Sequence, residues 1–166
     1  IVQAVAALGV PGATVRLNHR GVFNRFLGRV GAGDKSVETL RIVDKLAKIG
    51  EAETRRLLEE LIGENAAAEI LEFIREGEAF GPTHERMTRL AGGRNPDSDR
   101  VEALFAMADA CGLGDTVRLS PSITRGLDYY TGAVFETFID RIPEIGSVCS
   151  GGRYNDLASL YTKQRL

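Results

Sequence analysis

The sequence RGLDYYTGAVFE spans residues 125–136, and GSVCSGGRYNDL follows at residues 146–157. In both, β-branched or aromatic residues run between glycines and other turn residues, which is typical of short strands divided by turns. The segment TVRLSPSI at residues 116–123 has the same character. Residues 113–166 are therefore predicted to supply neighbouring strands of one sheet.

The beginning of the chain predicts a helix, a strand and a second helix. Residues 2–8 are helix-like. Residues 13–20 alternate apolar and polar side chains, which is a strand pattern. Apolar side chains then recur at helical spacing over residues 22–30, and Asn18 or His19 is expected to begin this helix.

Between these two regions lies a block that reads as almost all helix, from Ser36 to about Gly112. Apolar side chains recur at helical spacing in residues 36–49, 51–63, 65–78 and 96–112. Ser36 is expected to cap the first helix only in part, because Thr39 stands where a capping box has Glu or Gln. The last helix is expected to begin at Pro96 or Asp97. A sheet interrupted by a helical insertion, an α+β fold, is the simplest account.

The composition is that of an ordinary globular protein, with 43% hydrophobic and 27% charged residues. The formal net charge of -2 gives no sign of nucleic-acid binding, so such a partner would need a local basic patch. No apolar run is long enough to span a membrane, so a membrane partner is not expected. Cys111 and Cys149 lie far apart without a CxxC pair, which argues against a zinc site and favours reduced thiols in a cytoplasmic protein.

The segment RGLDYYTG carries groups that could bind a small polar ligand. Arg125 is permanently charged and can hold a phosphate or carboxylate by two parallel hydrogen bonds. In a strand, Tyr129 and Tyr130 point to opposite faces, so one could enter a pocket. A phenol both donates and accepts, as a neutral imidazole does. The alternative is a hairpin with surface tyrosines and a solvated arginine.

The segment SGGRYNDL is a second candidate. Gly151 and Gly152 would let the backbone approach a ligand or a neighbouring strand closely, and Tyr154 could close a small pocket. The alternative is a glycine turn before a helix that starts near Asn155. The only histidines, His19 and His84, lack partners at motif spacing and are expected to have surface or capping roles.

Taken together in this order, RGLDYYTGAVFE and CSGGRYNDL resemble the two histidine-specific motifs of histidyl-tRNA synthetases, and VRLNHRGVFNRFL at residues 15–27 resembles the segment before their insertion. The resemblance implies part of the class II antiparallel sheet with flanking helices. It assigns residues 1–31 to a catalytic-core segment, residues 32–112 to a helical insertion domain, and residues 113–166 to core strands.

The resemblance also implies roles for individual residues. Arg125 would be catalytic and would bind ATP, lying against its α-phosphate. Tyr129, Tyr130 and Tyr154 would form the histidine pocket, with Gly151 and Gly152 letting the sheet backbone approach the ligand. ATP would enter with Mg²⁺ as the substrate complex, and no metal site is expected in the chain itself.

The resemblance is incomplete, and two other kinds of protein are alternatives. Asn155 stands where the second motif usually has Asp, so a charge at that position is lost. Other class II motifs and an anticodon-binding domain are not recognised, so the chain alone is expected to be inactive and to hold no cofactor. The parent would be a cytoplasmic homodimer that binds histidine, ATP and tRNA(His). The alternatives are a regulatory subunit of ATP phosphoribosyltransferase and a domain that senses uncharged tRNA.

Overall fold

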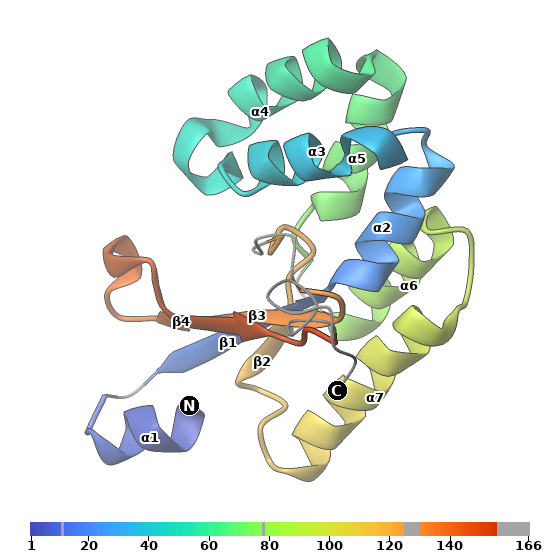
Figure 1. Cartoon of the computed structure of the whole chain (residues 1–166). Helices are drawn as coiled ribbons and strands as arrows, with labels where there is room; N and C mark the ends of the chain where they lie inside the picture. Colours follow the sequence, from blue (N-terminus) through green and yellow to red (C-terminus); the bar gives the residue numbers. More distant parts are fainter. Residues whose placement is uncertain (11, 78, 125–129, 156–166) are drawn as a thin grey trace, which may run out of the picture.

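The computed structural model describes residues 1–10, 12–77, 79–124 and 130–155 (Figure 1). In chain order the elements are α1 (Val2–Ala7), β1 (Ala13–His19), α2 (Arg20–Arg29), η1 (Gly33–Lys35), α3 (Ser36–Val43), α4 (Leu46–Ile62), α5 (Glu64–Ile74), α6 (Phe80–Leu90), α7 (Pro96–Ala110), β2 (Val117–Leu119), β3 (Ala133–Ile139), η2 (Pro143–Ile145) and β4 (Ser147–Gly152). The predicted mixture of sheet and helices is confirmed.

The described strands form a single sheet in the order β2-β1-β3-β4. β3 pairs antiparallel with both β1 and β4, as the family resemblance implies. β1 and β2, however, are parallel, with Val15 opposite Val117, so the sheet is not antiparallel throughout. Parallel neighbours need a long crossover connection, and here the helices α2 to α7 supply it.

The helices are arranged in two groups (Figure 1). α6 and α7 lie beside the sheet, while α3, α4 and α5 stack into a separate tier above it, and α2 rises from the sheet toward that tier. α2 begins directly after β1, because His19 is extended and its Nδ1 accepts a hydrogen bond from the Gly21 N–H. His19 therefore has the capping role that the sequence predicts.

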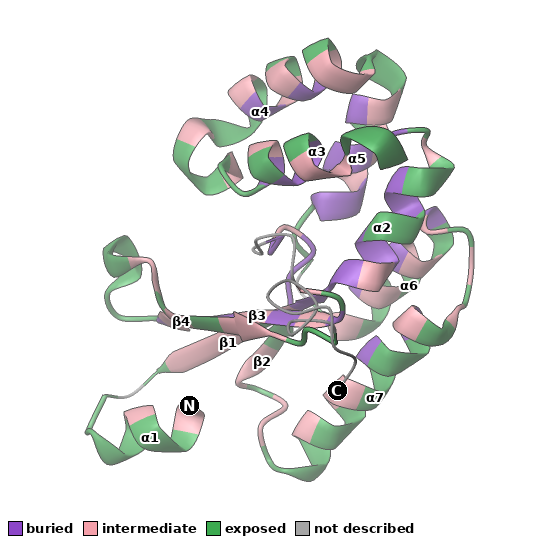
Figure 2. Cartoon of the chain, in the orientation of Figure 1, coloured by how far each residue is buried: buried purple, intermediate pink, exposed green. Residues whose placement is uncertain are grey.

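One aromatic cluster joins α2 to the upper tier of helices. The ring of Phe73 in α5 stacks on Phe26 in α2 with centroids 4.4 Å apart, and meets Phe23 edge-on at 5.1 Å. All three side chains are 1% exposed or less. Figure 2 shows the same feature as a buried stretch along α2. The hydrophobic core is thus continuous from α2 into the helical block, and the domain boundaries at residues 31 and 112 stay a prediction.

Two local predictions in the helical block need correction. Ser36 is already the first residue of α3, behind Lys35, and no side chain caps this helix. A serine whose own backbone is helical is in the wrong place to accept from the first N–H groups. The apolar run at residues 36–49 is also not one helix, because α3 ends at Val43 and α4 begins at Leu46. The later break falls at Gly50, whose φ of 80° suits glycine.

The N-terminus of α7 has a full capping box. Asn95 Oδ1 accepts from the N–H groups of Asp97 and Ser98 at 3.0 and 3.1 Å, and Ser98 Oγ accepts from the Asn95 N–H at 2.9 Å. Pro96 at the first helical position adds a preset φ and needs no hydrogen-bond partner. The start of this helix at Pro96 is as predicted.

Replacing Asn95 by alanine is expected to lower the free energy of unfolding by about 1 kcal/mol, because two helix N–H groups lose their acceptor. Urea unfolding followed by circular dichroism measures this change. Asn24→Ala is the matched control, since Asn24 is exposed within α2 and alanine favours a helix there. Equal stability of Asn95→Ala and the unsubstituted chain would show that the cap contributes nothing.

Candidate functional site

The ends of β3 and β4 bring together two segments that the sequence singles out. The register places Val134 opposite Gly152. The pairing continues beyond the strand ends, because Arg153 N–H donates to the Ala133 oxygen at 2.8 Å and Arg153 O accepts from the Thr131 N–H at 2.8 Å. Residue 130 is thereby held beside residue 154.

Tyr130 and Tyr154 stack at this place. Their ring centroids are 5.6 Å apart and the ring planes differ by 19°. Tyr130 is half-buried, whereas Tyr154 is 42% exposed. An offset stack of this kind fixes the position of both rings relative to each other. Two phenols that lie in different sequence motifs therefore share one surface.

The two adjacent glycines of β4 serve opposite faces of the sheet. A Cβ at Gly152 would lie 2.6 Å from Tyr130 Cδ1 and 2.9 Å from the Ala133 oxygen, so only glycine lets the Tyr130 ring rest there. A Cβ at Gly151 would instead meet the Phe135 ring at 2.7 Å. Successive residues of a strand face opposite sides, so Gly152 belongs to the tyrosine face and Gly151 to the Phe135 face.

Asn155 completes the turn that carries Tyr154. Its Oδ1 accepts from Arg153 Nε at 2.9 Å, and its backbone N–H donates to Thr131 Oγ1 at 3.0 Å. An aspartate could accept the same bond from Arg153, so the change to Asn keeps this contact and removes only the charge. Sequence reasoning did not single out Thr131, and a hydroxyl directly after the tyrosine pair was the available signal.

A cavity of about 330 Å³ opens at the same strand ends, lined in part by Thr131, Arg153, His19, Asp97 and Arg100. Burial lowers the pKa of His19 below its ordinary value; Asp97 opposes this shift, and Arg100 and Arg153 add to it. A neutral ring fits the bond in which His19 Nδ1 accepts from a backbone N–H. Tyr130 and Tyr154 are not part of this lining, so the cavity and the tyrosine pair are separate features.

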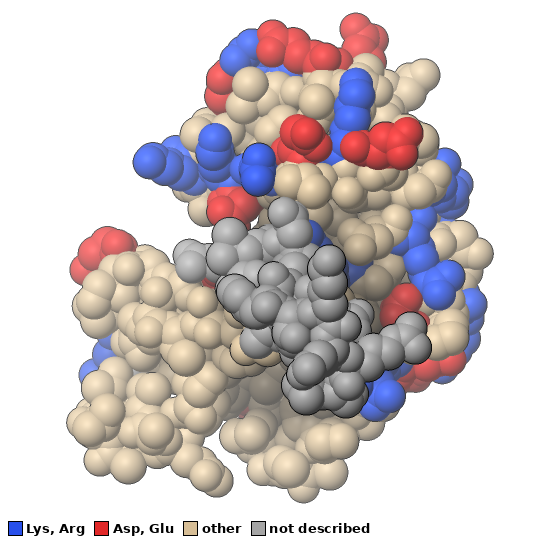
Figure 3. Space-filling view, viewed as in Figure 1, with Lys and Arg blue, Asp and Glu red and all other residues tan. Residues whose placement is uncertain are grey.

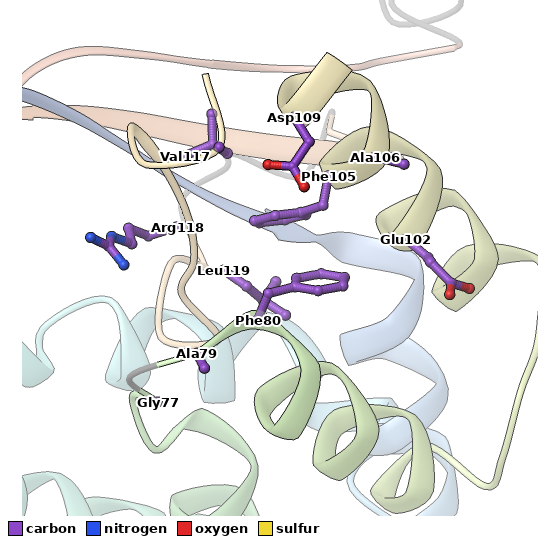
Figure 4. Close-up of a pocket in the computed structure, with 11 residues that line it drawn as sticks. Gly77, Ala79, Phe80, Glu102, Phe105, Ala106, Asp109, Val117, Arg118 and Leu119 are labelled. Carbon is purple, nitrogen blue, oxygen red and sulfur yellow. The ribbon is translucent and has the colours of Figure 1, made fainter. Parts of the chain in front are cut away.

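A second cavity, of about 420 Å³, lies between α6, α7 and β2 (Figure 4). Phe80 and Phe105 stack in its wall with centroids 4.3 Å apart, and Asp109 and Arg118 also line it. Of the predicted site residues that the structure describes, none lines it. It therefore has no part in the candidate site.

Several arginines of the helical block pair with glutamates. Arg56 binds Glu53 at 2.7 Å and Glu60 at 2.5 Å on the surface of α4. Figure 3 shows positive and negative side chains interleaved over this block. Exposed pairs of this kind contribute little to stability. A mixed, solvated face is therefore the better description of α4, rather than a dedicated basic patch.

The structure brings Tyr130, Tyr154 and Gly152 together, while Gly151 supports the opposite face. Arg125 and Tyr129 lie outside the described residues. Within the described ranges no cluster of three His, Cys, Asp or Glu side chains could hold a metal ion. In the same ranges no helix has the length and apolar character needed to cross a membrane.

Comparisons with known proteins give one consistent result. The family model described as histidyl-tRNA synthetase matches residues 1–166. The chain is 47% identical to a histidine–tRNA ligase of Treponema denticola, over 99% of this chain and 38% of that protein. A crystal structure of histidyl-tRNA synthetase from Nostoc sp. PCC 7120 matches with a TM-score of 0.89 at 25% identity, over 99% of this chain and 40% of that one.

A third match is more distant. The structure of an ATP phosphoribosyltransferase regulatory subunit/histidyl-tRNA synthetase from Bacillus halodurans has a TM-score of 0.75 at 20% identity. The match covers 95% of this chain and 41% of that one. At this identity the likeness is one of fold alone. In all three comparisons the chain spans well under half the length of the protein that it matches.

Proposed function

The chain belongs to the histidyl-tRNA synthetase family, and we propose that it is part of the catalytic domain of a histidine–tRNA ligase. The whole protein would activate histidine with ATP and transfer it to tRNA(His). Residues 32–112 would be the insertion that approaches the tRNA. We further propose that the whole protein is a cytoplasmic homodimer and takes ATP as its Mg²⁺ complex.

The proposed reaction has two steps. A carboxylate oxygen of histidine attacks the α-phosphorus of ATP, a new P–O bond forms, and the bond to the leaving pyrophosphate breaks. A ribose hydroxyl at the tRNA 3′ end then attacks the histidyl carbonyl and displaces AMP. Arg125 is proposed to stabilise the negative charge on the α-phosphate oxygens, which a permanently charged guanidinium does at little reorganisation cost.

The stacked pair of Tyr130 and Tyr154 on the bare backbone of Gly152 is the observation that carries this proposal. One fixed phenol can donate to the unprotonated ring nitrogen of histidine, and a second can accept from the N–H of the other ring nitrogen. An apolar amino acid could make neither hydrogen bond, and each hydrogen bond lost in a buried site costs about 1–3 kcal/mol. Two phenols on one surface thus give a physical basis for selecting an imidazole.

Histidine-dependent exchange between ATP and pyrophosphate, measured in the whole protein, tests the proposed function. We expect robust exchange that requires histidine and is not supported by leucine or phenylalanine. Histidine binding without any exchange would instead favour a regulatory protein, such as a regulatory subunit of ATP phosphoribosyltransferase. Exchange with another amino acid in preference to histidine would overturn the proposal.

Tyr130→Phe is expected to weaken histidine binding far more than ATP binding. The variant keeps the ring that rests on Gly152 and removes one hydroxyl, a loss of about 1–3 kcal/mol, or about 5- to 150-fold in Kd. Isothermal titration of each ligand separately measures the two effects. Tyr161→Phe, outside both motifs, is the matched control. An equal loss for both ligands would remove Tyr130 from the histidine pocket.

A further inference from the structure

The connecting segment (residues 120–124) links the end of β2 to Arg125. It is buried over most of its length, with Ser120 at 1%, Ile123 at 8% and Thr124 at 4% exposure. It is not a strand, so its carbonyl oxygens lack a regular ladder of partners. Buried carbonyls need hydrogen-bond donors, and here side chains supply them.

Asn18 provides two of these donors. Its Nδ2 donates to the oxygens of Pro121 and Ile123, both at 2.9 Å, and its Oδ1 accepts from the His19 N–H at 2.8 Å. Asn18 is 2% exposed. A carboxamide carries two N–H donors and an acceptor in one plane, and all three capacities are used at this position.

Arg20 supplies the next donor along the segment. Its Nη1 donates to the oxygen of Thr124 at 3.1 Å, and Thr124 directly precedes Arg125 in the sequence. Arg20 is 7% exposed, so water competes little for this bond. The short sequence Asn18-His19-Arg20 at the β1–α2 junction therefore binds three carbonyl oxygens in the four residues before Arg125.

The helical block holds the same segment from the other side. Glu76 Oε1 accepts from the hydroxyls of Ser120 and Ser122 at 2.7 and 2.5 Å. Thr124 Oγ1 donates to the Leu40 oxygen in α3 at 3.3 Å. The connecting segment is thus fixed between the sheet and the helices.

The sheet register places this anchor on the tyrosine face. Asn18 is opposite Val134, and Val134 is opposite Gly152, on which the Tyr130 ring rests. Residues directly opposite one another project to the same face of a sheet. The Asn18 amide and the Tyr130 ring therefore lie on one face of the sheet. The hydrogen bonds from Asn18 hold the connecting segment at this face.

We infer that Asn18 and Arg20 are positioning residues for Arg125. They fix the backbone of residues 121–124, which lead directly into Arg125, the residue proposed to act at the α-phosphate. This inference rests on the proposed function, because it concerns the same reaction. Neither side chain is required to touch substrate.

Asn18→Asp in the whole protein tests the inference. The substitution keeps the shape and the acceptor for the His19 N–H, but an ionised carboxylate cannot donate to the two carbonyl oxygens. A displacement of about 1 Å at a reacting group costs about 100-fold in rate. We expect kcat for ATP–pyrophosphate exchange to fall by about that factor while KM for histidine stays within about threefold.

Asn18→Ser is the second variant, because it introduces no buried charge and still removes one of the two donors. We expect kcat to fall by about 10-fold with KM for histidine again unchanged. Asn95→Asp is the matched control: the same substitution is made at a helix cap, where Asp serves as well as Asn, and kcat should be retained. Thermal unfolding shows which variants are folded.

Four outcomes are decisive. Lower kcat with unchanged KM in a folded Asn18 variant supports the inference. A kcat equal to that of the unsubstituted protein overturns it. A change in kcat and KM together also overturns it, because a general loosening of the fold would alter both. An unsubstituted protein without histidine-dependent exchange overturns the proposed function itself, and the inference with it.

Discussion

Histidine-dependent ATP–pyrophosphate exchange is expected to fall by about 100- to 1,000-fold when Arg125 is replaced by alanine in the whole protein. Removing one preorganised group that stabilises developing charge typically has an effect of this size. Because the charge on the α-phosphate oxygens grows in the transition state, the loss should appear mainly in kcat. Histidine binding measured without ATP should change little.

The control for this experiment is Arg141→Ala. Arg141 is exposed in the turn after β3, at the opposite end of that strand from Ala133. Its loss removes the same charge and should leave exchange within about twofold of the unsubstituted rate. If Arg125→Ala and Arg141→Ala gave the same rate, Arg125 would have no role at the phosphate.

The second large effect is expected from Gly152→Ala. The new methyl group would lie 2.6 Å from the Tyr130 ring and 2.9 Å from the Ala133 oxygen. The oxygen belongs to the backbone and binds Arg153 N–H, and Tyr130 is backed by the stacked Tyr154 ring. Neither neighbour can move without breaking a contact, and overpacking of this kind costs about 1–3 kcal/mol.

We therefore expect Gly152→Ala to raise the Kd for histidine by about 10- to 100-fold, measured by titration calorimetry. Gly28→Ala is the matched control, because Gly28 lies within α2 and a Cβ there meets nothing within 4 Å. That variant should bind histidine normally and be slightly more stable. Unaltered histidine affinity in Gly152→Ala would show that the position of the Tyr130 ring is not needed.

Local chemistry explains which elements the sequence predicts well. The alternation at residues 13–20 and the turn residues around residues 133–139 indicate β1 and β3, since each pattern is complete within a few residues. The sequence predicts a helix start at Asn18 or His19, and His19 is the N-cap residue of α2. These features depend on neighbours in the chain, so no long-range information is needed.

Features that depend on distant residues could not be read in the same way. The parallel pairing of Val15 with Val117 joins residues about a hundred positions apart, and no local pattern encodes it. The hydrogen bonds from Asn18 to Pro121 and Ile123 are hidden for the same reason. Tyr130 and Tyr154 could be placed together only through the family resemblance, and their role in binding histidine stays a prediction.

The aromatic contact between α2 and α5 limits how this fold can be shortened. Excising residues 32–112 would remove Phe73 and leave Phe23 and Phe26 facing water. Buried aromatic side chains of this kind cover about 150–250 Å² each, enough to create a patch that favours aggregation. A protein of this fold without these helices would therefore need polar residues along the corresponding side of α2. An engineered minimal enzyme would need the same substitutions.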